Sequence, residues 1–309
     1  KYAFLILAHT DPPQLRRLIH ALDDERFDFF VHIDQHSNIS QFAFDQYDLK
    51  HSTLQVLDNR HPVFWGDISV VEATLSLYRA AHVTKLYSRY ITLSGLDYPI
   101  KSNQIIYDAL SDLSVEHIAA CSLFHDISFK IQGFYLWRYG PKITTLCQRV
   151  YKLGFFRHKA HLKIQGKECP VYFSSQWHAL SHEFVSFMLK LLEDDPKILK
   201  FFKYAYAPDE LLIPTVLFNS PFGERATTLT APEGTDFESL FSALPTLHYL
   251  RRDNRNLVAL DERALPDLIS SDKLFFRKAT SGVSDELIHR INRLRDAGHE
   301  SLPKIPVDQ

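Results

Sequence analysis

The sequence is poor in cysteine and contains no long hydrophobic run. Its three cysteines, Cys121, Cys147 and Cys169, are widely spaced and form no CxxC pair. No disulfide framework is therefore expected, and this cysteine content favours a reducing cytoplasm. No stretch of 18 consecutive apolar residues occurs, so no segment is predicted to cross a bilayer as a helix.

Motifs that identify several enzyme classes are also absent. There is no GxGxxG after a predicted strand and no GxxxxGK[ST], which argues against classical dinucleotide and P-loop sites. HExxH and GxSxG are missing, and no Asp-x-Asp occurs anywhere in the chain. His178 and His182 are four positions apart and could share a helix face, but no third ligand is near them in the sequence. No metal site is therefore expected.

Acidic residues are absent between Asp126 and Glu168, although the formal net charge of the whole chain is only −2. That net charge favours neither nucleic acid nor a globally acidic target. The acid-free segment carries nine basic residues, Lys130, Arg138, Lys142, Arg149, Lys152, Arg157, Lys159, Lys163 and Lys167, with interleaved aromatic residues. Two interpretations stay open. The segment is either a surface for phosphates, anionic lipid or an anionic glycan, or a solvated insertion whose aromatic residues pack inward.

The first 120 residues alternate strand and helix patterns. Runs of strand length occur at 3–8, 28–33, 53–57, 90–93 and 117–120, and helices are predicted from Pro12, over 68–83 and over 103–113. This rhythm predicts an α/β fold with a mostly parallel central sheet flanked by helices. Ligands of such sheets bind at the carboxyl ends of the strands, which is where His9, Asp34 and the turn at 94–97 fall.

The second half of the chain continues with shorter elements. After the basic segment we expect a strand at 171–174, a helix over 183–192 with Ser181 as its N-cap, and a helix that opens at Pro208-Asp209-Glu210. Short strands are predicted near 227–229 and 247–250.

Sequence blocks spread over about 2–280 resemble one family. The blocks are FLILAH (4–9), VHID (31–34), VFWG (63–66), LSGLDYPIKS (93–102), SQWHALS (175–181), PDE (208–210) and LFFRK (274–278). Single blocks are weak signals, but LSGLDYPIKS, SQWHALS and PDE together are specific. On these blocks the chain resembles the core-2/I-branching β-1,6-N-acetylglucosaminyltransferases and peptide O-xylosyltransferases, whereas 122–168 matches poorly.

The resemblance implies a GT-A-like nucleotide-sugar-binding fold without a DxD metal site, and an inverting reaction with one carboxylate base. The base corresponds to Glu210. Lys278 corresponds to the lysine that holds the UDP diphosphate, and its arginine partner is assigned to Arg255, with Arg251 and Arg252 as alternatives. In the absence of a DxD motif, such cations must neutralise the leaving diphosphate.

The other matched positions surround the donor. The resemblance places His9, Asp34 and Trp65 around the nucleotide, and Trp177 and Asp209 at the wall on the sugar side. Asp97 lies in the GLDYP turn, where it is expected either to cap the turn or to contact substrate.

We expect a single GT-A-like domain over 1–300. It comprises a nucleotide-binding half (1–120), a basic insertion (122–168) and an acceptor and catalytic half (169–280), and 301–309 is expected to be a loose tail. The expected activity is a metal-independent, inverting transfer of N-acetylglucosamine or xylose from a UDP-sugar to a hydroxyl of a glycan, lipid-linked or peptide acceptor, in bacterial surface polysaccharide or glycoconjugate synthesis. No cofactor, metal or nucleic acid is expected.

A cytoplasmic location is expected, and contact between 127–167 and the anionic inner face of the membrane is a hypothesis. Two alternatives remain. An inactive nucleotide-sugar-binding protein of the same fold would bind UDP without turnover. An unrelated metal-dependent α/β hydrolase using Asp34 or Asp97 would lose its activity in EDTA.

Overall fold

The computed structural model describes residues 1–122, 125–153, 162–228, 244–253 and 256–297. Its central sheet has the order β10–β4–β1–β2–β3. The strands β1 (Tyr2–Ala8), β2 (Phe27–Ile33), β3 (Leu54–Val56) and β4 (Arg89–Ser94) run parallel, and β10 (Ala179–Ser181) is antiparallel to β4. The predicted α/β class with a mostly parallel sheet is therefore confirmed.

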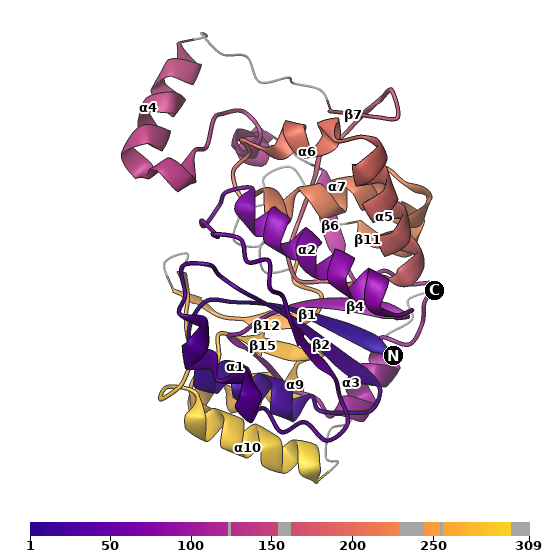
Figure 1. Cartoon of the computed structure of the whole chain (residues 1–309), viewed down its shortest axis with the longest axis vertical. Coiled ribbons are helices and arrows are strands. Elements are labelled where there is room, and N and C mark those ends of the chain that lie inside the picture. The colour runs from indigo at the N-terminus through magenta and orange to yellow at the C-terminus, as the bar shows by residue number, and fades with distance from the viewer. Residues whose placement is uncertain (123–124, 154–161, 229–243, 254–255, 298–309) are drawn as a thin grey trace.

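Helices cover both faces of this sheet. Side chains of β1 alternate between two apolar cores, since Phe4 packs with residues of α1 (Pro12–Ala21), whereas Leu5 packs with residues of α2 (Ser69–Thr84). Figure 1 shows α2 on one side of the sheet and α1 on the other. Because both faces are covered, every residue of β2 is buried, as is typical of a parallel strand.

The helix predicted over 103–113 is shorter in the structure. α3 runs only over Asn103–Ala109. The guanidinium of the fully buried Arg89 accounts for this early end, because it donates to the carbonyl oxygens of Leu110 (3.1 Å), Asp112 (2.6 Å) and Val115 (2.7 Å). These carbonyl groups are satisfied by a side chain instead of by a further helical turn.

Within the described residues, the strand predicted at 117–120 meets the central sheet only through an isolated antiparallel bridge between His117 and Ala179 of β10. It appears as β6 (Ala119–Ser122) in a separate sheet of order β11–β6–β9, with β11 (Thr227–Thr228) parallel and β9 (Tyr172–Ser174) antiparallel to it. The alternation of strands and helices therefore predicted the strand but not its partners.

A third sheet connects the beginning and the end of the chain. It has the order β12–β15–β5, with β12 (His248–Leu250), β15 (Phe275–Arg277) and β5 (Asp97–Pro99). β15 pairs antiparallel to β5, and β5 is the short strand that follows β4 of the central sheet in the chain. This pairing brings Arg277 and Lys278 to the first half of the fold.

The remaining helices form two groups. α5 (His182–Asp194), α6 (Lys197–Phe202) and α7 (Leu212–Phe218) share a core with α2, whereas α9 (Leu265–Ser270) and α10 (Asp285–Asp296) pack against the β15–β5 side. The predicted cap of α5 is confirmed, since Ser181 Oγ accepts from the backbone N–H of Phe184 at 3.2 Å. No helix among these described residues is both long and apolar enough to cross a membrane.

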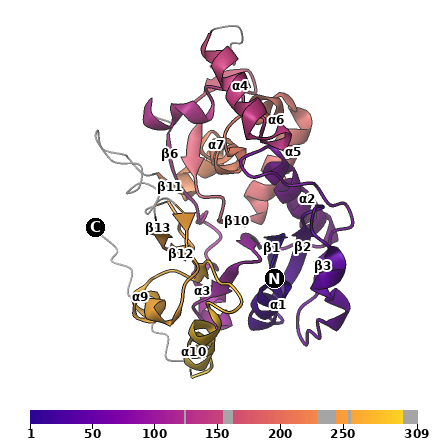
Figure 2. The same cartoon turned by 90° about the vertical axis from the view of Figure 1, so that its left-hand side faces the viewer.

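The basic insertion contains η3 (His125–Lys130), η4 (Trp137–Tyr139), α4 (Pro141–Lys152) and a hairpin of β7 (Leu162–Ile164) and β8 (Lys167–Cys169). In Figure 1, α4 stands out at the upper left of the molecule, and Figure 2 views the molecule from that side. The remaining short elements are η1 (Ile39–Phe42), η2 (Phe44–Gln46), η5 (Pro208–Glu210), η6 (Pro221–Arg225), β13 (Arg252–Asp253), β14 (Asn256–Leu257) and η7 (Glu262–Ala264).

Candidate active site

Three predicted residues follow strand ends, two in the central sheet and one in the third sheet. His9 follows β1, Asp34 follows β2, and Lys278 follows β15. The backbone N–H of Asp34 donates to the carbonyl of Ala8 (2.9 Å), so the two central strand ends are adjacent. Burial lowers the pKa of His9, and the charges of Arg277 and Lys278 lower it further, against the opposing effect of Asp34. His9 therefore lies within electrostatic reach of both cations.

Asp34 ties two loops together. Its Oδ1 accepts from the backbone N–H of His36 (2.9 Å) and of Val63 (3.3 Å), and it lies 2.9 Å from His36 Nδ1. The carboxylate therefore fixes the loop that continues through Trp65 and Gly66.

Lys278 carries an uncompensated charge at this edge. Within the described part of the chain, its ammonium has no carboxylate partner, and partial burial together with the neighbouring Arg277 lowers its pKa. A partly buried ammonium without a carboxylate partner, next to a second cation, attracts negative charge.

Arg277 was not among the predicted site residues, yet it is held rigidly. Its Nη1 donates to Asp97 Oδ1 at 2.8 Å, and its guanidinium lies 4.8 Å from the centre of the Trp177 ring. Asp97 Oδ2 also accepts from the backbone N–H of Ser94 (2.7 Å) and lies 3.2 Å from His248 Nε2. Burial alone would raise the pKa of Asp97, but Arg277 and His248 hold it below its usual value.

This geometry gives Asp97 and Trp177 supporting positions. The Asp97 side chain is fully buried and Trp177 is 6% exposed, so neither presents an open surface to a substrate. Of the two roles expected for Asp97, turn capping is the one seen, through its bond to Ser94. Both residues lie beneath Arg277 and fix its orientation.

The arginines proposed as partners of Lys278 are placed differently. Arg255 lies outside the described residues. Arg251 donates to Asp267 Oδ2 at 2.8 Å on the protein surface, and Arg252 is part of β13. Arg277 directly precedes Lys278 in the sequence, and its contacts hold its guanidinium in place. It therefore fits the role of partner of Lys278 better than Arg251, which already pairs with Asp267. The RK dipeptide in LFFRK was a signal that could have indicated it.

The PDE turn forms the opposite part of the site. Pro208–Glu210 is a 3₁₀ turn, and the α-helix predicted to open there begins only at Leu212. The backbone N–H of Ala207, a residue with a positive φ of 49°, donates to the carbonyl of Gly66 at 3.1 Å. The loop held by Asp34 therefore also holds the turn that carries Glu210.

Glu210 lies beside a lysine that the sequence did not single out. The ammonium of Lys130 is 2.6 Å from Glu210 Oε2, and it also lies over the rings of Phe173 (4.7 Å) and Tyr206 (5.0 Å). Lys130 is buried, whereas the Glu210 side chain is 21% exposed. Glu210 Oε1 has no partner among the described residues, so one carboxylate oxygen is free.

The neighbouring Asp209 lies in the interior. It is buried, and its Oδ1 has no hydrogen-bond partner among the described residues. Burial raises its pKa, the charge of Glu210 raises it further, and Lys130 opposes the shift. Asp209 lines a small cavity with Gln176 and His178, the residues on either side of Trp177. The turn of Glu210 and the support of Arg277 are thus contiguous in the fold.

Aromatic side chains surround the Lys130–Glu210 pair. Trp65 is 71% exposed, and its ring centre lies 5.6 Å from that of Tyr206 and 6.0 Å from that of Trp137. A Cβ atom on Gly66, which has a φ of 73°, would lie 3.1 Å from Trp137 Nε1, so the loop approaches the insertion closely. The contacts of Trp65 are therefore with the surroundings of Glu210.

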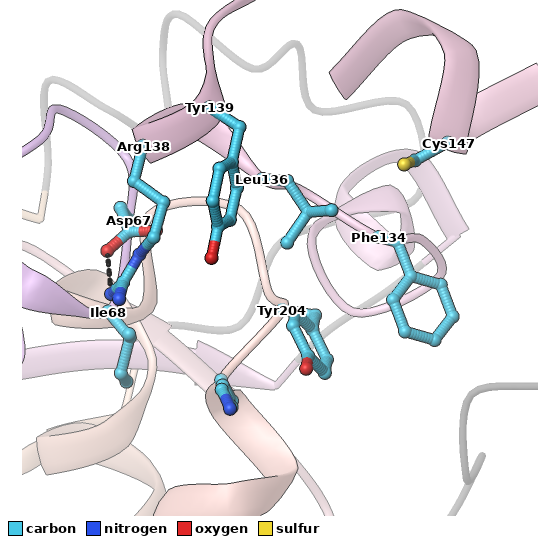
Figure 3. Close-up of a pocket in the computed structure, with 9 residues that line it drawn as sticks. Asp67, Ile68, Phe134, Leu136, Arg138, Tyr139, Cys147 and Tyr204 are labelled. Carbon is cyan, nitrogen blue, oxygen red and sulfur yellow. Dashed lines mark hydrogen bonds and ion pairs between the residues drawn. The ribbon is translucent and has the colours of Figure 1, made fainter. Parts of the chain in front are cut away.

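A cavity of about 360 Å³ lies between the loop after Gly66 and the insertion. Figure 3 shows the Arg138–Asp67 ion pair at one side of it, with Nη2 and Oδ1 2.7 Å apart, and Leu136, Tyr139 and Tyr204 around the space. Phe134 of the insertion packs inward here, since its ring centre lies 5.0 Å from that of Tyr204, whereas Tyr139 is 60% exposed. The inward-packing interpretation therefore holds for Phe134 but not for Tyr139.

The two histidines weighed as metal ligands do not share a helix. His178 precedes β10 and His182 begins α5, so the expectation of a common helix face is wrong. His178 is buried with its Nε2 2.9 Å from the hydroxyl of Tyr78. Over the described ranges, no group of three or more His, Cys, Asp or Glu side chains is arranged to hold a metal ion.

Comparisons with known proteins agree with the resemblance. The sequence profile described as "Branch: Core-2/I-Branching enzyme" matches residues 2–231. Rat xylosyltransferase 1 is 25% identical over 232 residues, which are 72% of this chain and 26% of that protein. Dog xylosyltransferase 2 is 25% identical over 229 residues, 72% of this chain and 25% of that protein. The chain thus covers about a quarter of the length of these curated relatives.

Solved structures show only a distant likeness. Mouse xyloside xylosyltransferase 1 in its apo form has a TM-score of 0.35 and 12% identity, covering 79% of this chain and 93% of that one. S. aureus TarS 1–349 in complex with UDP-GlcNAc has a TM-score of 0.34 and 11% identity, covering 74% of this chain and 56% of that one. Likenesses at this level carry no conclusion about activity.

Proposed function

We propose, from the premise that this chain belongs to the Core-2/I-Branching enzyme family, that it is an inverting glycosyltransferase that needs no metal ion. It transfers a sugar from a UDP-sugar to an acceptor hydroxyl. Two features carry the proposal: a cation without a carboxylate partner among the described residues, Lys278, and a carboxylate with a free oxygen, Glu210. The loop that Asp34 holds at Val63 continues to Gly66, whose carbonyl accepts from the backbone N–H of Ala207 in front of the PDE turn.

The cationic side chains would bind the diphosphate. The charges of Lys278 and Arg277 act on His9, which lies at the strand ends where ligands of parallel sheets bind. As the bond between the anomeric carbon and the diphosphate oxygen breaks, negative charge develops on UDP. The two fixed cations stabilise that charge in the role that a divalent cation has in other nucleotide-sugar enzymes.

The carboxylate would activate the acceptor. Glu210 Oε1 accepts the proton of the acceptor hydroxyl while the hydroxyl oxygen forms a bond to the anomeric carbon, on the face opposite the departing UDP. Attack from that face inverts the anomeric centre. Lys130 holds the other carboxylate oxygen in place, so the free oxygen keeps a fixed direction.

The donor sugar and the acceptor are proposed at the level of class. The names of the relatives make UDP-xylose the first donor to test, and the name of the family adds UDP-N-acetylglucosamine. The exposed Trp65, beside Tyr206, offers an aromatic surface to a sugar ring of the acceptor. We place the reaction in the synthesis of bacterial surface polysaccharide or glycoconjugate.

The proposal is tested with a panel of nucleotide sugars in EDTA, first by thermal shift and then by donor turnover. We expect UDP-sugars to stabilise the protein and to be turned over without metal. Glu210→Gln should lower turnover at least about 100-fold and leave UDP affinity unchanged. UDP binding without turnover of any donor would indicate an inactive binding protein, and activity that EDTA abolishes would overturn metal independence.

A further inference from the structure

The helix α4 exposes its apolar side to solvent. Ile143, Leu146 and Leu153 are 44%, 60% and 72% exposed, and they recur at the spacing of one helix face. The opposite side of the helix faces the protein with Thr144, which is buried, and with Gln148, whose Nε2 donates to the carbonyl of Phe134 at 2.7 Å. A helix whose apolar side served the core of this protein would have the reverse orientation.

Positive charge borders the exposed stripe. Lys142 and Arg149 flank the stripe at helical spacing, and Lys152 is exposed at the last position of α4, on the side of Gln148. None of the three has an acidic partner among the described residues. No acidic residue occurs in the sequence between Asp126 and Glu168. The other two basic residues of the described part of the insertion near this helix are already paired, Arg138 with Asp67 and Lys130 with Glu210.

We propose that the stripe Ile143–Leu146–Leu153, with its basic border, docks this protein onto an anionic lipid bilayer. An interfacial helix of this kind inserts its apolar face at the boundary of the acyl chains while Lys and Arg meet the anionic headgroups. The charge pattern selects this occupant over a second copy of the chain. A symmetric dimer through the stripe would bring the same basic residues of two copies together.

Docking would also orient the turn that carries Glu210. The insertion that carries α4 contacts the loop of Trp65 and Gly66 through Trp137, and the 360 Å³ cavity lies between this loop and the insertion. Glu210 is held by the same loop through the bond between Ala207 and Gly66. A bilayer bound at α4 would therefore be connected to Glu210 through the insertion and this loop. Binding of α4 to a bilayer requires no glycosyl transfer, and it is measured by binding to vesicles alone.

The test is co-sedimentation of the whole chain with vesicles of phosphatidylcholine alone and with about 30% phosphatidylglycerol added. We expect binding to the anionic vesicles only. Raising the salt from about 0.1 M to about 1 M shortens the Debye length from about 10 Å to about 3 Å, so it should release the protein. No binding to anionic vesicles, or equal binding to both kinds, would overturn the proposal.

Two matched pairs of variants locate the contact. Leu146→Glu with Leu153→Glu should weaken binding at least about tenfold, whereas Val83→Glu with Leu86→Glu, at exposed positions elsewhere, should not. Lys142→Gln with Arg149→Gln should weaken it to a similar extent, whereas Arg263→Gln with Arg290→Gln, at exposed positions outside the insertion, should not. Circular dichroism checks that each variant folds. Stripe variants that bind normally, or that instead abolish self-association seen by analytical ultracentrifugation, would count against the bilayer.

Discussion

The ammonium of Lys130 lies 2.6 Å from Oε2 of Glu210, although 80 positions separate the two residues in the sequence. One residue comes from the basic insertion and the other from the PDE turn. The insertion is therefore part of the site as well as a surface feature. Its lysine occupies one oxygen of the carboxylate that we propose as the base.

Replacing Lys130 with methionine should lower kcat at least about tenfold, because Glu210 would lose the charged bond that fixes its orientation. UDP affinity should stay unchanged, since Lys278 and Arg277 are untouched. Steady-state kinetics and calorimetric titration with UDP separate the two effects.

Lys142→Met is the matched control, because Lys142 is an exposed lysine of the same insertion without an acidic partner. Thermal unfolding tells whether the buried substitution has damaged the fold. A folded Lys130→Met protein with normal kcat would remove Lys130 from any role in orienting the base.

Replacing Lys278 with methionine should weaken UDP binding about tenfold or more, which corresponds to about 1.4 kcal/mol. Lys273→Met serves as control, since Lys273 already pairs with Asp272 at 3.4 Å.

The replacement of Lys278 has a second consequence, for the titration of His9. Burial and the two cations together lower the pKa of His9, so loss of the Lys278 charge should raise it. NMR titration of the imidazole, assigned with a His9→Gln variant, measures this change. Unaltered UDP affinity together with an unaltered His9 titration would show that Lys278 acts on neither.

Replacing Trp65 with alanine should raise the KM for the acceptor about threefold to tenfold, because an exposed indole beside Tyr206 would lose its stacking with a sugar ring. The affinity for UDP should not change. Trp65→Tyr, which keeps an aromatic face, should recover part of the loss. The resemblance assigned Trp65 to the nucleotide. If the alanine variant loses UDP affinity and keeps its acceptor KM, that assignment is the correct one.

The protein should lose stability between pH 7.5 and 5.5. Burial lowers the pKa of His32 to about 4 and that of His178 to about 3, so both stay neutral in the folded protein while the unfolded chain takes up protons near pH 6.5. The unfolded state binds more protons, and the free energy of unfolding therefore falls as the pH falls. Over this range the loss is about 1.4 kcal/mol for each buried histidine.

Urea unfolding at a series of pH values measures this loss. His32→Gln should reduce the slope of stability against pH, although it also removes the bond in which His32 Nε2 accepts from the backbone N–H of His61 at 2.8 Å. His289→Gln, at an exposed position of α10, should leave the slope unchanged. A stability that does not vary over this pH range would contradict the burial of neutral histidines.

The sequence alone determined the elements whose signals are local. The apolar runs of β1, β2 and β4, the proline at the start of α1 and the serine that caps α5 each act within a few residues, so they were predictable one by one. The position of His9 and Asp34 at strand ends followed from the same local reasoning, and the LSGLDYPIKS, SQWHALS and PDE blocks indicated the family.

Only the tertiary structure decided which distant groups meet. Arg277 and Asp97 are 180 positions apart, and their 2.8 Å bond exists because β15 pairs with β5. Strand pairing is a choice among partners that no local pattern specifies, which is also why the pairing of β6 with β9 and β11 did not follow from the strand predicted at 117–120. The outward orientation of α4 has the same origin. Periodicity identifies an apolar face, but only the packing of Thr144 and Gln148 against the body shows that this face is directed to solvent.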